Sequence, residues 1–362
     1  MKSKHNTNQR IIIAGNLGDG STEAGLIKGF RNLGWDVLPL DAGAFFTNGR
    51  GKFNRAFARV RLPFSVRAYN DAIIETVEAS GSKFFLTVKG SYISGRTLER
   101  IRELGVSTVN YYPDYHFEYA GIKEQDFTGY DVFFTTKSFQ VDYLRENIGH
   151  KCVSFLHHGY LSGYHAPPED MPDPAFTTDI VYIGNHTQEK EAWLRSIKRR
   201  LPAAHFKIYG NRWDTAQNRE IFGESIAGFP LYGRDYAKAI YSARTNIAIH
   251  MGRVRNSRWA DLVSTRTFEI PACKGFMLHV DNEEVRQLFT PGVEIDVFKD
   301  ADELCEKIEY YLAHDDVRRH MVERAYQRCV PAYSYDERAR EIANRLQLMR
   351  ETGARSIDEL EP

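Results

Sequence analysis

The feature that most constrains this fold is a repeated alternation of short apolar runs with segments of helix length. Residues 10–15 form an apolar run, a glycine-rich turn follows, and residues 22–33 have helical character before a second run at 34–41. This order makes a βαβ unit with parallel strands and a right-handed crossover. Further strands are expected at 84–88, 107–111, 131–136 and 152–156, and helices at about 70–80, 95–104 and 138–147. The alternation predicts a doubly wound α/β domain.

The same alternation restarts beyond a proline-rich, acidic segment at 167–174, which has the composition of a linker. A chain of 362 residues is longer than one domain usually needs and fits two. We therefore expect an N-terminal domain over residues 1–168, a second domain over 169–332, and a final segment over 333–362 that contains a helix.

Composition and charge favour a protein that works without nucleic acid, a membrane span or a metal. Lys+Arg and Asp+Glu are equal at 48 each, so no charge bias indicates nucleic acid. The polar start has no signal-peptide core, and no run of 18 apolar residues exists. We expect a cytoplasmic protein with four reduced cysteines. His157 and His158 have no partners at metal-ligand spacing, so we expect neither a metal nor a cofactor.

The segment 261–280 carries the strongest functional pattern. Thr265 and Thr267 are candidate N-caps of a short helix, Gly275 suits its end, and a strand-length apolar run follows. A helix N-terminus suits an anion such as a diphosphate, and Arg266 beside it would clamp phosphate through two hydrogen bonds. Glu269, expected to be exposed at this helix start, would accept hydrogen bonds from sugar hydroxyls. An ordinary surface helix, with Glu269 complementing the helix dipole, fits the local pattern as well.

The sequence of residues 264–278 closely resembles the signature of the CgeB-like (spore-protein) glycosyltransferases, which are related to the group 1 glycosyltransferases. The resemblance continues through 284–294, 298–304 and 310–312, and is strong over about 178–345. Lys274 departs from the family, which often has a small residue or glycine there.

This resemblance implies a GT-B fold, in which two Rossmann-like domains face a central cleft and the last helix crosses back to the N-terminal domain. It also implies transfer of a sugar from a nucleotide-diphosphate sugar to an acceptor without a metal. Asp261 and Glu269 have a D-x7-E spacing that is close to the E-x7-E of retaining group 1 enzymes. There the first acid lies near the transferred sugar and the second near the ribose.

Other donor-binding residues follow from the same resemblance. Gly184, Asn185 and Lys190 align with a loop in which Arg and Lys hold the donor diphosphate, although Asn185 stands in the place of Arg. We expect Arg253, Arg255 or Arg258 to supply the missing charge, unless they belong to a solvated basic loop. Lys190 is equally compatible with an exposed helix lysine beside Glu189. The turn after the strand at 206–209 would hold a nucleobase through backbone groups and a flat side chain, with the candidates Tyr209, Gly210 and Trp213.

In the N-terminal domain, Gly18 and Asp19 belong to a turn that faces the cleft in GT-B enzymes, and we expect them to bind the donor, although packing alone accounts for such a turn. Asp114 follows a strand and is the candidate general base. The sequence thus predicts a hexosyltransferase-type enzyme. A GT-B sugar-nucleotide epimerase and a non-catalytic two-lobed binding protein remain the alternatives.

Overall fold

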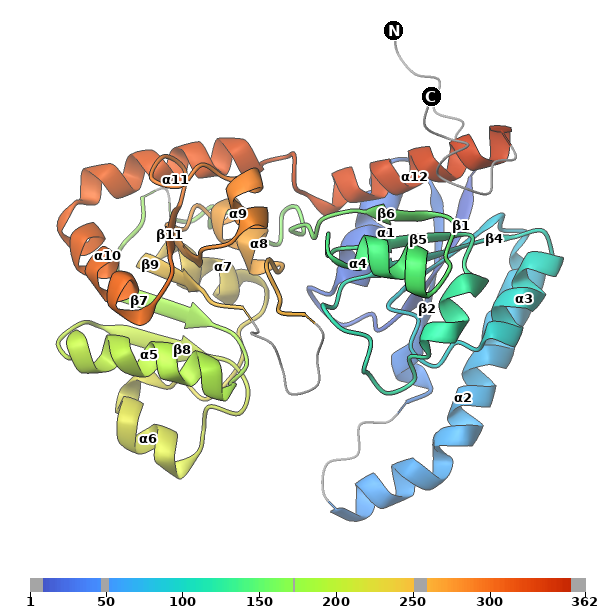
Figure 1. Cartoon of the computed structure of the whole chain (residues 1–362), viewed down its shortest axis with the longest axis horizontal. Helices are drawn as coiled ribbons and strands as arrows, with labels where there is room; N and C mark the ends of the chain where they lie inside the picture. The colour runs from blue at the N-terminus through green and yellow to red at the C-terminus, as the bar shows by residue number, and fades with distance from the viewer. Residues whose placement is uncertain (1–8, 47–51, 172, 251–258, 353–362) are drawn as a thin grey trace, which may run out of the picture. The chain divides into compact units, whose positions relative to one another are not determined.

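The computed structural model describes residues 9–46, 52–171, 173–250 and 259–352 (Figure 1). The chain divides into two compact units. Unit 1 consists of residues 1–158 and 335–362, and unit 2 consists of residues 159–334. Each unit is a parallel sheet with helices between its strands, so the predicted α/β class is confirmed.

Unit 1 is built on a six-stranded parallel sheet with the order β2-β1-β3-β4-β5-β6. The inner strands β3 and β5 are buried along their whole length because both faces of a doubly wound sheet are covered, whereas the edge strand β2 is partly exposed. The strand order reverses between β1 and β3. The strands are β1 (Arg10–Gly15), β2 (Asp36–Asp41), β3 (Phe84–Val88), β4 (Ser107–Tyr112), β5 (Val132–Thr135) and β6 (Val153–Phe155).

The helices of unit 1 include one that comes from the far end of the chain. Helix α12 packs along α1, with the Tyr335 hydroxyl 3.0 Å from that of Thr22. A Cβ atom on Gly29 would lie 2.6 Å from the Tyr335 carbonyl oxygen, so glycine is required for this close packing. The helices are α1 (Thr22–Asn32), α2 (Lys52–Ser80), α3 (Gly95–Glu103), α4 (Gln140–Asp142) and α12 (Tyr335–Thr352), with short turns η1 (Ala42–Ala44), η2 (Glu124–Gly129) and η3 (Tyr143–Asn147).

Unit 2 is built on a five-stranded parallel sheet with the order β11-β10-β9-β7-β8. Successive residues face opposite sides, so Ile247 packs with one hydrophobic cluster and Ala248 with the other. The strands are β7 (Thr178–Ile183), β8 (Phe206–Tyr209), β9 (Ala243–Ala248), β10 (Met277–Val280) and β11 (Asp296–Phe298). The helices are α5 (Gln188–Arg200), α6 (Ala216–Phe222), η4 (Gly223–Ser225), α7 (Gly233–Tyr241), α8 (Arg266–Ala272), α9 (Glu283–Leu288), α10 (Ala301–Ala313) and α11 (Asp315–Cys329).

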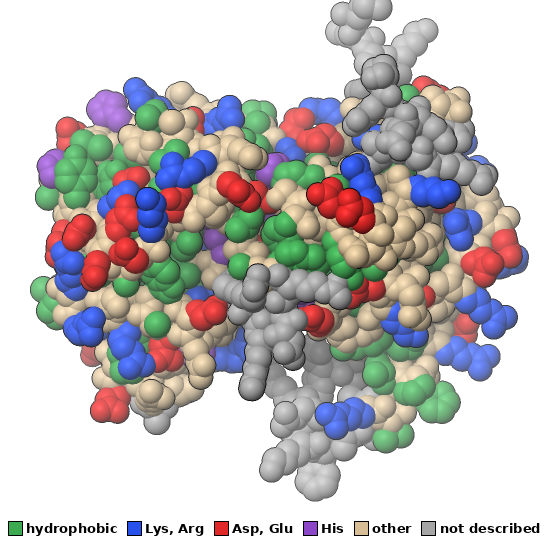
Figure 2. All heavy atoms as spheres, viewed as in Figure 1, with side chains coloured by type: hydrophobic (Ala, Val, Ile, Leu, Met, Phe, Trp, Pro, Cys, Tyr) green, Lys and Arg blue, Asp and Glu red, His purple; other side chains and the backbone are tan. Residues whose placement is uncertain are grey.

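The surface agrees with the balanced composition. Acidic and basic side chains alternate over the face shown in Figure 2, with no extended patch of one sign. Within the described part of the chain, no helix is both long enough and apolar enough to cross a bilayer.

Candidate functional site

The strand order of unit 2 reverses between β7 and β9. At such a reversal the loops that leave the two strands diverge, and ligands of open α/β sheets bind at this point, outside the carboxyl ends. The side chain of Arg266 lies there. Its Nη1 donates to the Ile183 carbonyl at 3.2 Å and its Nη2 to the Ile249 carbonyl at 3.1 Å. Arg266 therefore caps the ends of both strands with a positive charge.

A glycine after β7 makes room for this guanidinium. A Cβ atom on Gly184 would lie 2.8 Å from Nη1 of Arg266 and 2.6 Å from the Tyr182 hydroxyl. Gly210, which follows β8, has a φ of 140° and touches the Gly184 carbonyl. These two glycines allow the chain turns after β7 and β8 to approach each other and Arg266.

Lys190 brings a second positive charge into the same region. Thr187 caps α5, its hydroxyl accepting a hydrogen bond from the Lys190 amide at 3.4 Å, and this places Lys190 in the first turn. The residue is 5% exposed, so its alternative interpretation as an exposed lysine is wrong. Its Nζ donates to the Asn185 carbonyl at 3.4 Å. Burial, together with the charge of Arg266, lowers the pKa of Lys190 to about 7.

Neither cation is neutralised by contact. Among the residues that the structure describes, no carboxylate forms an ion pair with Lys190 or Arg266, and Nε of Arg266 is buried without a hydrogen-bond partner. Asp261 contributes only at longer range, where its charge raises the pKa of Lys190. A buried and a partly buried positive charge without a paired anion are the arrangement that an anionic ligand would stabilise.

Helix α8 begins at Arg266, between the two candidate N-caps Thr265 and Thr267. The amides of Thr267 and Phe268 already donate to the carbonyls of Ser264 and Thr265, at 3.1 and 2.9 Å. The Thr267 hydroxyl is fully buried and lies 3.0 Å from Nε2 of His279. The expected donor contact through Thr267 is therefore corrected: its side chain supports the core beneath the helix. Thr265 occupies the N-cap position and is partly exposed, but its side chain makes no capping hydrogen bond.

Glu269 differs from its expected exposure, since its side chain is only 12% exposed. The Tyr236 hydroxyl donates to its Oε2 at 2.5 Å, and Nε2 of His165 lies 3.8 Å from its Oε1. Nδ1 of His165 accepts from the Leu161 amide at 3.1 Å, which assigns the ring proton to Nε2, facing Glu269. Burial lowers the pKa of His165, and Glu269 opposes that effect. The carboxylate is thus held in place from two sides.

Residues 187–344 match the family model described as glycosyl transferase-like, which covers the part of unit 2 with Lys190, Arg266 and Glu269. No curated protein matches the chain in sequence.

Similar solved structures include a sucrose-phosphate synthase from Thermosynechococcus elongatus, with 14% identity, a TM-score of 0.68, and coverage of 95% of this chain and 99% of that one. A glycosyltransferase from Rickettsia africae has 13% identity, a TM-score of 0.64, and coverage of 93% and 97%. The Anabaena protein HepE, solved with UDP and glucose, has 9% identity, a TM-score of 0.62, and coverage of 94% and 99%. The chain has the GT-B fold.

Three further residues predicted for the donor site of this GT-B chain lie near Gly184. Trp213 is fully buried and its indole N–H donates to the Gly184 carbonyl at 2.8 Å. The expectation that its ring stacks on a nucleobase is therefore corrected, because the ring fills the core. Asn185 is exposed, and its Oδ1 accepts from the Asn211 amide at 3.0 Å. Tyr209 is partly exposed beside Phe229.

The candidates in unit 1 lie at the carboxyl edge of its sheet. Gly18 and Asp19 are exposed in the turn after β1. That turn is held by Glu23, a buried residue whose Oε1 accepts from the Asn16 amide at 3.0 Å, and burial raises the pKa of Glu23. Asp114 follows β4 and forms an ion pair with Lys89 at 2.5 Å, and both side chains are about a quarter exposed.

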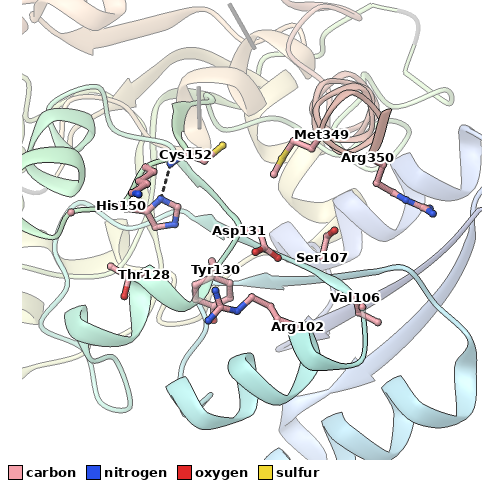
Figure 3. A pocket seen from close by; sticks show the side chains of 13 residues that line it. Arg102, Val106, Ser107, Thr128, Tyr130, Asp131, His150, Cys152, Met349 and Arg350 are labelled. Atoms are coloured by element: carbon pink, nitrogen blue, oxygen red, sulfur yellow. Dashed lines mark hydrogen bonds between the residues drawn. The ribbon is translucent and has the colours of Figure 1, made fainter. Parts of the chain in front are cut away.

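Arg258, with Arg253 and Arg255, lies outside the described residues. Among those described, no three His, Cys, Asp or Glu side chains converge as metal ligands would. A cavity of about 750 Å³ opens at the amino edge of β4, β5 and β6, where Arg102, His150 and Arg350 line it (Figure 3). None of the predicted site residues lines this cavity.

The residues that the sequence did not reveal are those that position others. Tyr236 and His165 hold Glu269, while Glu23 and Lys89 hold the turn and the acid of unit 1. Tyr236 lies 33 positions from Glu269, so no local spacing connects the two. Lys89 has a φ of 69°, a left-handed conformation that is unusual for lysine, but backbone angles are not visible in a sequence.

Proposed function

We propose that this protein is a CgeB-like glycosyltransferase that moves a sugar, of hexose type, from a nucleotide-diphosphate sugar to an acceptor without a metal. The observation that carries the proposal is the pair of cations at the strand reversal of unit 2, the buried Lys190 and the partly buried Arg266. The match of residues 187–344 to a glycosyl transferase-like family supports it.

The cation pair suits the chemistry of the leaving group. As the bond from sugar to diphosphate breaks, negative charge develops on the departing phosphate oxygens. Positive groups already fixed in a water-poor site stabilise that charge without reorganising, which is the role a metal ion plays in other enzymes. Arg266 is fixed by two carbonyls and Lys190 by the first turn of α5, so both are preorganised.

Glu269 is assigned to the sugar or ribose hydroxyls of the donor. Its carboxylate accepts from Tyr236 but retains acceptor capacity, since each carboxylate oxygen has two lone pairs. Asp261 is assigned to the transferred sugar. Gly184, Asn185, Tyr209, Gly210 and Thr265 would contact the donor through backbone or exposed polar groups.

We assign unit 1 to the acceptor, with Asp114 as general base, and we assign Gly18 and Asp19, in the turn after β1, to contacts with the donor. The ion pair with Lys89, at 2.5 Å, holds the Asp114 carboxylate in position. We further propose that the protein acts in the cytoplasm.

Two measurements test the proposal. A thermal-shift screen with UDP, GDP, dTDP and ADP and their sugars finds the donor, because a ligand of the native state raises its apparent stability. NMR of the matching donor without acceptor then separates the functions. Slow donor hydrolysis agrees with a transferase, inversion at a sugar carbon identifies an epimerase, and binding without turnover, with or without added acceptors, identifies a binding protein.

The matched variants are Lys190→Met and Lys198→Met, two lysines of the same helix. Only the first lies in the proposed phosphate site. If both variants bound the diphosphate equally well, Lys190 would not belong to a phosphate site, and the proposal would lose its main support.

A further inference from the structure

Helix α2 exposes an apolar pair in its first half. The sequence pattern predicted a helix only at about 70–80, but α2 extends over Lys52–Ser80 and its first half projects beyond the sheet of unit 1 (Figure 1). Val60 is 72% exposed and Phe64 is 74% exposed, the two highest values among the exposed large hydrophobic residues described. Residues four apart lie on one face of a helix, so the two side chains form one small apolar surface.

Basic residues flank this apolar pair. Between residues 59 and 68 the helix carries Arg59, Arg61 and Arg67 and no Asp or Glu. At 100° per residue, Arg67 falls on the same side as Val60 and Phe64, and Arg59 and Arg61 lie on either side of it. Hydrophobic and basic side chains are adjacent at this end of the molecule in Figure 2.

The same side of the helix changes sign further along. Asp71, Glu75 and Glu78 continue the stripe on which Val60 and Phe64 lie. Arg67 approaches Asp71 to 3.6 Å, but their side chains are 85% and 63% exposed, so this pair is weak and screened. The basic and apolar character is thus confined to the projecting part of the helix.

We propose that this part of α2, residues 59–68, docks on the surface of an anionic lipid bilayer. Phe64 and Val60 would enter the boundary between headgroups and acyl chains, while the three arginines would bind lipid phosphates. A second copy of the chain fits less well, because a two-fold contact through this face would bring arginines against arginines. The acidic residues from Asp71 onward would limit the contact to the projecting turns. This inference does not depend on the proposed function.

Sedimentation of the full chain with vesicles tests the proposal. We expect binding to vesicles of phosphatidylcholine with 30% phosphatidylglycerol, and little to pure phosphatidylcholine. The Val60→Ser/Phe64→Ser variant should bind roughly tenfold or more weakly, since it loses two apolar side chains at the boundary. Arg59→Gln and Arg61→Gln should each weaken binding about fivefold, and raising the salt to about 0.5 M should release the protein.

The controls match these changes elsewhere on the surface. Val293→Ser and Tyr310→Ser replace exposed apolar residues of unit 2, and Arg102→Gln replaces an exposed arginine of unit 1. All three should bind vesicles like the unchanged protein. Equal binding to neutral and anionic vesicles, or no binding to either, overturns the proposal. Loss of self-association in Val60→Ser/Phe64→Ser, without vesicle binding by the unchanged chain, would identify a second copy as the occupant instead.

Discussion

The positive charge of Arg266 acts on the buried ammonium group of Lys190, and the two cations are held together although each disfavours the other. The fold keeps the two charges in the same region, because Arg266 is hydrogen-bonded to strand-end carbonyls and Lys190 lies in the first turn of α5. A folded protein retains such repulsion between two cations where a ligand that binds there is stabilised by their charges.

Replacing Lys190 with methionine should raise stability while removing function. Methionine has nearly the same length as lysine and no charge, so the buried site loses its repulsion and desolvation cost. We expect a higher Tm in calorimetry, together with a tenfold to hundredfold weaker affinity for a nucleoside diphosphate, since a hydrogen bond to a charged group is worth about 1.5–3 kcal/mol. A lower Tm with unchanged affinity would show that Lys190 is structural.

Diphosphate binding should depend on pH through Lys190. A bound anion favours the charged ammonium and raises its pKa above the value of about 7 in the free protein. Below pH 7 the group is already protonated, and above it each binding event takes up a proton. Affinity should therefore fall as pH rises above 7, by at most about tenfold per unit. Calorimetry at pH 8 in two buffers of different ionisation enthalpy measures the proton uptake, which Lys190→Met should abolish.

Arg266→Lys should impair both stability and binding. Lysine cannot reproduce the two hydrogen bonds to the carbonyls of Ile183 and Ile249, which would lose their donor at the strand ends. We expect a lower midpoint in urea and roughly tenfold or greater loss of affinity for free nucleoside diphosphate as well as for the full donor. If only the full donor is affected, Arg266 acts on the sugar and not on phosphate.

Tyr236→Phe should remove the hydrogen bond that holds Glu269 without creating a cavity in the core. The ring remains, but the hydrogen bond to the carboxylate is lost, at a cost of about 1.5–3 kcal/mol in the free energy of unfolding. We expect a weaker donor interaction, seen as a higher KM, because Glu269 is then less well fixed. Phe222→Leu, a core change away from Glu269, controls for general loss of stability. If the KM of Tyr236→Phe equals that of the unchanged protein, Glu269 does not interact with the donor.

The sheets were predictable and the exposure of single side chains was not. A buried parallel strand is apolar along its whole length, so runs such as 10–15 and 84–88 identify themselves. The exposure of Trp213 depends on the carbonyl of Gly184, which lies 29 positions away. Glu269 is covered by residues from two other segments. The sequence motifs predict that these residues lie in one region, but the contacts that bury them are made by residues distant in the sequence.

The predicted length of α2 was wrong for a different reason. Hydrophobic periodicity detects a helix through the face that it buries, and residues 59–68 are mostly exposed. The first half of α2 therefore gave no periodic signal, and only the part that packs on unit 1 was recognised.

The membership of α12 in unit 1 has a consequence for synthesis of the chain. Residues 1–158 are synthesised before unit 2, but the helix that packs along α1 is synthesised after it. Unit 2 is continuous, so all of its strands are available before Tyr335 is made. The unit that is translated second can thus finish folding first, while α1, with Gly25 and Gly29 uncovered, lacks its partner helix until α12 has been made and is open to chaperones until then.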